Sequence, residues 1–86
     1  MKEIAELLKS LGPNYTLEWS MEYFGQEHVM IMTLVYWNTT IKMSFKQQHS
    51  IPFAQIENLD KYGKEILDGM SRGIQDELRK TWKEYL

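Results

Sequence analysis

The segment HVMIMTLVYW, residues 28–37, constrains the fold more than any other part of the sequence. A strand with one face in water alternates apolar and polar residues, because successive side chains point to opposite faces. Here both alternating sets are apolar: Val29, Ile31, Val35 and Trp37 on one side, and Met30, Met32, Leu34 and Tyr36 on the other. One set can line a core. The question is what covers the second set.

The neighbouring segments predict that this strand is the middle one of an antiparallel meander. YTLEWSMEYF, residues 15–24, alternates apolar and polar residues throughout, and TIKMSFK, residues 40–46, alternates again. GQEH, residues 25–28, predicts a four-residue turn before the middle strand. Asn38-Thr39 predicts a tight two-residue turn after it.

Both ends of the chain show helical periodicity. The first apolar set, followed by Gly12-Pro13 as a typical helix end, is Ile4, Leu7, Leu8 and Leu11. After a predicted loop over residues 47–58, a second helix runs from about Asn58, its candidate N-cap, to the end of the chain. Its apolar stripe is Leu59, Tyr62, Ile66, Met70, Ile74, Leu78 and Trp82. Gly69 and Gly73 leave open whether this helix is continuous, and we favour one helix.

These elements predict a single α+β domain spanning residues 1–86, in the order helix, three strands, helix. Both helices are expected on one face of the sheet. The two predicted turns pair Trp19 with Leu34 and Leu34 with Met43. The residues that this register places under the helices are Tyr15, Leu17, Trp19, Met21, Tyr23, Met30, Met32, Leu34, Tyr36, Ile41, Met43 and Phe45.

The other face of the sheet is then left without helices. We call its apolar residues, Val29, Ile31, Val35 and Trp37, the reverse stripe. The predicted register places Glu18 opposite Val35 with Lys42 beyond it, and Glu22 opposite Ile31 with Lys46 beyond it. Lysine stems and neighbouring side chains could partly cover the stripe. Alternatively, an apolar stripe with a charged rim is typical of a protein interface, where tryptophan is enriched.

The sequence contains no motif typical of a catalytic, cofactor-binding or metal-binding site. It contains no phosphate-binding glycine loop, no HExxH and no nucleophile elbow. With no cysteine and only His28 and His49, the chain offers at most half of a four-ligand metal site. We therefore expect no enzyme, with no catalytic, cofactor-binding or metal-binding residues, and no cofactor.

Charge and hydropathy narrow the choice of partner. Ten Lys plus Arg against twelve Asp plus Glu give a formal charge of −2, so no positive field attracts nucleic acid or an anionic membrane. The longest apolar run is too short to cross a bilayer, and the N-terminus lacks a signal-peptide pattern. We expect a cytoplasmic protein that does not enter a membrane.

One resemblance supplies an alternative function. The order of elements, Pro13 and Tyr15 at the first strand and Gly25-Gln26-Glu27-His28 in the first turn resemble the double-stranded RNA-binding domain over residues 2–80. That family reads a minor groove with a Gly-x-x-His turn and holds phosphates with lysines at its second helix. Here the entry to the second helix is HSIPFAQIENLD, acidic and apolar. We therefore do not expect nucleic acid as a partner.

The expected function is non-enzymatic binding of another protein. A small protein without motifs is similar to the regulators and inhibitors that phages and mobile elements encode against host machinery such as defence nucleases. The expected partner-binding residues are the reverse stripe and its rim: Val29, Ile31, Val35, Trp37, Glu18, Glu22, Lys42 and Lys46. The partner is another protein or a second copy in a homodimer, since a small core gains from a symmetric partner.

Overall fold

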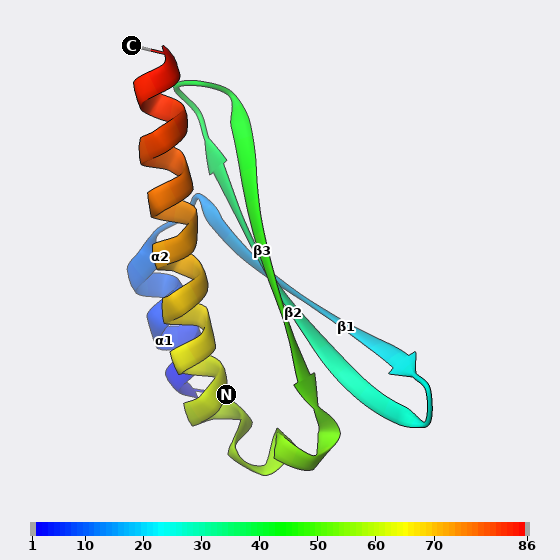
Figure 1. The fold of residues 1–86 in the computed structure, drawn as a ribbon. Coiled ribbons are helices and arrows are strands. Elements are labelled where there is room, and N and C mark those ends of the chain that lie inside the picture. Colours follow the sequence, from blue (N-terminus) through cyan, green and yellow to red (C-terminus); the bar gives the residue numbers. More distant parts are fainter. Residues whose placement is uncertain (1, 86) are drawn as a thin grey trace.

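Two helices lie on one side of a three-stranded antiparallel sheet in a computed structural model that describes residues 2–85 (Figure 1). The strand order in the sheet is β1-β2-β3. The elements in chain order are α1 (Lys2–Leu11), β1 (Tyr15–Phe24), β2 (Glu27–Asn38), β3 (Met43–Pro52), the 3₁₀ helix η1 (Phe53–Asn58) and α2 (Leu59–Tyr85). The predicted α+β class and the predicted order of elements are confirmed.

The two ends of helix α1 are stabilised in different ways. Gly12 has φ +102°, which a glycine adopts without strain, and its N–H donates to the Lys9 carbonyl at 3.2 Å. At the other end, the backbone N–H groups of Glu3 and Ile4 donate to the Asp60 carboxylate at 2.9 and 3.0 Å. The first N–H groups of a helix have no partner within it, so Asp60 joins the start of α1 to the first turn of α2.

The turn between β1 and β2 differs from the prediction. It consists of Gly25 and Gln26 alone, and Phe24 pairs with Glu27. Gly25 has φ +60°, which suits the first position of a two-residue hairpin turn. The predicted four-residue turn was wrong, and Trp19 pairs with Met32 instead of Leu34.

The turn between β2 and β3 is longer than predicted, at residues 39–42. The side chain of Asn38 accepts hydrogen bonds from the backbone N–H groups of Thr40 at 3.0 Å and Ile41 at 3.1 Å. An asparagine that bonds to the backbone two residues on replaces a tight backbone turn with this wider one. Lys42 completes the turn with φ 55°.

Strand β3 therefore begins later than predicted and runs through the first half of the segment predicted as a loop. Leu34 pairs with Gln47 instead of Met43. The error at the first turn displaces the pairing by two residues, and the error at the second displaces it by four. Since strand side chains alternate with period 2, an even displacement keeps every residue that lies in a strand on its predicted face, whereas Ile41 and Lys42 lie in the turn. The predicted assignment of residues to the two faces of the sheet survives both errors.

The core lies between the helices and this assigned face. Met32 and Leu34 are completely buried, as are Ile51 of β3 and Ile74 of α2. Leu67 of α2 is also completely buried, although the predicted stripe omitted it. Helix α2 is continuous through Gly69 and Gly73 over its 27 residues, as we favoured.

A close approach between the helices explains one of the glycines of α2. A Cβ built on Gly63 would lie 2.6 Å from Cδ1 of Ile4, which is itself 3% exposed. A side chain at this position would therefore force the buried Ile4 side chain to move. Gly69 has no atom within 4 Å of such a Cβ, so only Gly63 of the two is required by packing.

Candidate protein-binding surface

The reverse stripe lies on the face of the sheet away from both helices, as predicted. Trp37, near the end of β2, is 45% exposed. Ile31 and Val35 are half-buried between the side chains of the two outer strands, whereas Val29 is only 8% exposed. The open part of the stripe is therefore Ile31, Val35 and Trp37, and Val29 contributes little surface.

Thr33 divides this stripe at its centre. Its hydroxyl accepts a hydrogen bond from Gln48 Nε2 at 3.2 Å, and the residue is 6% exposed. The reverse stripe is thus two apolar segments separated by a satisfied polar pair. The larger segment is the pair Val35 and Trp37.

The acidic side of the predicted rim is present but displaced. Glu18 lies opposite Thr33 instead of Val35, and Glu22 lies opposite Val29 instead of Ile31. Both glutamates are exposed on β1. They flank the stripe toward the β1–β2 turn and leave Val35 beside Thr16, a neutral residue.

The basic side of the rim is partly wrong. Lys46 lies in β3 opposite Val35, next to the open end of the stripe. Lys42 was predicted in the same strand, but it belongs to the turn that Asn38 organises and has a left-handed backbone. One lysine of the two therefore borders the reverse stripe within the strand.

A second exposed apolar surface lies on the other face, where the prediction placed core. Met21 is 59% exposed, Tyr23 is 60% exposed and Phe53 of η1 is 39% exposed. The His28 ring lies between the two aromatic rings, with centroids 4.8 Å from Tyr23 and 5.7 Å from Phe53. We call Met21, Tyr23, His28 and Phe53 the hairpin-end patch. The core positions predicted for Met21 and Tyr23 were wrong.

The lengths of the elements explain why the helices leave this patch uncovered. A ten-residue helix such as α1 spans about 15 Å, whereas a ten-residue strand such as β1 spans about 33 Å. Helix α2 is longer but packs mainly on α1 and β3. Figure 1 shows the β1–β2 hairpin pointing away from both helices. The short length of α1 was available from the sequence, but the packing of α2 on α1 and β3, away from the hairpin end, was not.

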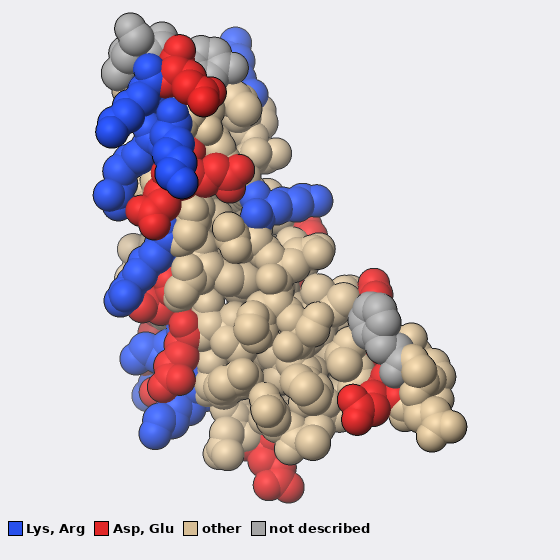
Figure 2. All heavy atoms as spheres, viewed as in Figure 1, with Lys and Arg blue, Asp and Glu red and all other residues tan. Residues whose placement is uncertain are grey.

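Charged side chains are concentrated on the helices. Only five charged residues lie between residues 13 and 56: Glu18, Glu22, Glu27, Lys42 and Lys46. Figure 2 shows blue and red side chains crowded along α2, while much of the remaining surface in that view is uncharged. The sheet therefore presents the least charged surface of the molecule.

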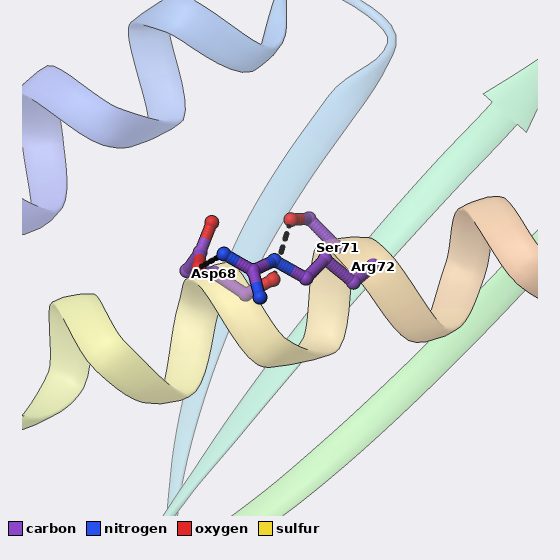
Figure 3. A network of polar contacts seen from close by, with 3 residues as sticks. All are labelled: Asp68, Ser71 and Arg72. Atoms are coloured by element: carbon purple, nitrogen blue, oxygen red, sulfur yellow. Dashed lines mark hydrogen bonds and ion pairs between the residues drawn. The ribbon is translucent and has the colours of Figure 1, made fainter.

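The charges on α2 largely neutralise one another. Arg72 and Asp68 form an ion pair of 2.8 Å one turn apart, and the Ser71 hydroxyl donates to the Asp68 carbonyl at 2.7 Å (Figure 3). Arg79 and Asp76 form a longer pair of 3.7 Å. Such exposed pairs contribute little to stability. They leave this face of α2 solvated, with its cations matched by acids.

A polar groove between the end of α1 and α2 contains Tyr15, Gln75, Arg72 and Arg79. Gln75 Nε2 donates a hydrogen bond to the Tyr15 hydroxyl. Burial raises the pKa of the Tyr15 phenol above its usual value. Among residues 2–85, no three His, Cys, Asp or Glu side chains gather in a way that could hold a metal ion.

No helix in the described part of the chain combines the length and the apolar composition needed to cross a lipid bilayer. Comparisons of the chain with models of protein families, with curated proteins and with solved structures found no match.

Proposed function

We propose that this chain is a non-enzymatic protein-binding domain that recognises another protein through the helix-free face of its sheet. The observation that carries the proposal is the exposure of Trp37, at 45%, beside Val35 on a face that neither helix covers. A large aromatic side chain with an apolar neighbour is the kind of anchor that dominates the binding energy of protein interfaces.

The surroundings of Trp37 support this choice. The neighbouring residues on the same face are Val35, Ser44 and Lys46, so the anchor has one apolar neighbour and a polar rim. Interfaces characteristically combine an apolar centre with a polar border, and charged residues are depleted at the centre. A partner of matching chemistry presents an apolar pocket for Trp37 and an acidic group for Lys46.

The role that we propose for this binding is that of a regulator or inhibitor, of the type that phages and mobile elements encode against host machinery such as defence nucleases. The small size of the domain supports this role, because a protein that inhibits by binding needs a contact surface and no catalytic residues. The lack of cysteine fits a reducing compartment, and we place the activity in the cytoplasm.

The RNA-binding alternative gains no support from the geometry of its candidate residues. His28 lies between the rings of Tyr23 and Phe53 instead of at the tip of the turn. Lys61 and Lys64, in the first turns of α2, line a groove together with Glu3, Glu65 and Asp68. Acids this close offset the positive charge that a phosphate backbone requires.

Site-specific photocrosslinking in a lysate of the source organism tests the proposal. A photoreactive residue at Ser44, exposed and opposite Trp37 in the sheet, samples the proposed surface. The same residue at Glu77, exposed on α2, is the matched control. We expect one protein to crosslink from position 44 and not from position 77, and Trp37→Ala to reduce its yield by about tenfold or more.

Identical crosslinks from the two positions would contradict the proposed surface. A crosslink from position 44 that Trp37→Ala leaves unchanged would remove Trp37 as the anchor. Recovery of RNA instead of protein, with a yield that falls steeply as salt is raised, would favour the nucleic-acid alternative.

A further inference from the structure

The outer edge of β1 presents backbone groups without a neighbouring strand. Trp37 N donates to the Asn14 carbonyl at 3.0 Å, one position beyond the first pair of the β1–β2 register, Tyr15 with Tyr36. In an antiparallel pair, hydrogen-bonded and non-hydrogen-bonded positions alternate. The even-numbered residues of β1 therefore bond to β2, and the N–H and C=O groups of the odd-numbered residues point outward, among them Trp19, Met21 and Tyr23.

Apart from the exposed Glu18 and Glu22, this edge lacks the features that usually prevent strand addition. Proteins commonly protect an edge strand with lysine, proline, a bulge or a covering element. Strand β1 contains no lysine, proline or glycine over its ten residues. Strand β3, the other edge, contains Lys46 and ends at Pro52. The two edges of one sheet thus differ, and β1 is the one open to another strand.

Exposed apolar side chains accompany these backbone groups. The side chains of Met21 and Tyr23 are about three-fifths exposed, at 59% and 60%, and Trp19 is half-buried. All three lie on the same face, since they are two residues apart. An added strand would gain main-chain hydrogen bonds at the edge and apolar contacts on this face, the two components of recognition by strand addition.

We propose that the occupant of this edge is β1 of a second copy, paired antiparallel about a two-fold axis at Met21. In this register Trp19 of each copy faces Tyr23 of the other, and the two Met21 residues face each other. About six main-chain hydrogen bonds form. The two three-stranded sheets become one six-stranded sheet with the helices of both copies on the same side.

The glutamates of β1 select this register. They lie on the face away from the helices, four residues apart. A two-fold axis at Ser20 places Glu18 opposite Glu22 of the second copy, and like charges directly opposite destabilise a sheet. An axis at Met21 places Glu22 opposite Ser20. An axis at Trp19 extends the pairing to Tyr15, whose N–H already bonds to the Gly12 carbonyl at 3.4 Å.

The side chains of β1 are complementary to those of β1 in a second copy of the chain. The apolar residues repeat at every second position, so the same sequence read in the opposite direction is complementary to itself. No cation is needed, because each Glu22 faces a serine. This pairing uses the β1 edge and leaves Trp37 free, so it is independent of the partner proposed above.

Sedimentation of the purified full chain tests the oligomer. We expect a dimer at about 100 μM, a concentration at which micromolar association is well populated. Met21→Lys should give a folded monomer, because the side chain is 59% exposed in the folded chain and does not belong to its core. Ser50→Lys, an exposed position on the opposite edge, is the matched control and should stay dimeric.

A disulfide scan tests the register. Because the chain contains no cysteine, each introduced cysteine can form a disulfide only with the same residue of a second copy. Met21→Cys should oxidise readily to a covalent dimer, because directly opposed hydrogen-bonded residues have Cα atoms about 5.5 Å apart, within the range that a disulfide spans. Glu18→Cys should remain reduced, since it lies far from its own copy in this register.

A monomeric wild-type chain at this concentration would overturn the proposal. A dimer that survives Met21→Lys, or one that Ser50→Lys disrupts, would place the interface elsewhere. Faster oxidation of Glu18→Cys than of Met21→Cys would overturn the register.

Discussion

Asp60 is the residue that fixes the position of α1. Its carboxylate accepts the two N–H groups at the start of α1, at 2.9 and 3.0 Å, from the first turn of α2. An acid in the first turn of a helix is favourable by itself, but a contact across 57 residues has no local signature in the sequence. Trp37 and Lys42 show the same contrast. Alternation alone placed Trp37 correctly, whereas the position of Lys42 depended on a side-chain hydrogen bond of Asn38.

The pH dependence of stability should report the bond of Asp60. Its two backbone hydrogen bonds lower the pKa of this carboxyl in the folded chain. A group with a lowered folded pKa contributes stability above its unfolded pKa, about 3.9, and loses that contribution as the pH falls through the folded value. We expect Asp60→Ala to lower the melting temperature near neutral pH, and the difference from wild type to shrink in acid.

Asp68→Ala is the matched control for this measurement. Asp68 lies two turns along the same helix and forms only an exposed pair with Arg72, so its removal should change the melting temperature little. Equal effects of the two substitutions, or a difference for Asp60→Ala that grows in acid, would contradict the role of Asp60.

At the scale of the elements, the alternation of apolar residues carried more information than the turns. Strand β1 was predicted with its observed bounds, and both faces of the sheet were assigned correctly. The lengths of the two turns were wrong, because they depend on the backbone conformation of Gly25 and on the side chain of Asn38. Strand β3 shifted as a consequence, and part of a predicted loop became strand.

The glycines of α2 allow the packing of the two helices to be tested by paired substitutions. Gly69→Ala should raise the free energy of unfolding by about 0.5 to 1 kcal/mol, because alanine has the higher helix propensity and nothing lies within 4 Å of the new Cβ. Gly63→Ala introduces a methyl 2.6 Å from Cδ1 of the buried Ile4. It should lower stability by about 1 to 3 kcal/mol.

Chemical denaturation of both variants checks this prediction. An equal gain for the two substitutions would show that α1 does not pack against Gly63 in solution. A second variant, Gly63→Ala with Ile4→Val, should recover part of the loss, because it removes the methyl nearest to the new Cβ.

At the scale of the whole molecule, two helices of unequal length cover one face of the sheet incompletely and leave the other face open. The open face was predicted, because both faces of the middle strand are apolar. The exposure of the hairpin end was missed, because periodicity assigns a residue to a face without showing how far the helix above it extends. Charged residues follow the same division, with most of them on the helices and few on the sheet.

The most direct test of this account compares two residues of β2 that point to opposite faces. Leu34 is completely buried and Trp37 is 45% exposed. Leu34→Ala should lower the free energy of unfolding by about 2 to 5 kcal/mol. Trp37→Ala should change it by about 1 kcal/mol or less and reduce the yield of the crosslink from position 44 by about tenfold or more. Unfolding by Trp37→Ala together with tolerance of Leu34→Ala would show that the proposed binding face is the core.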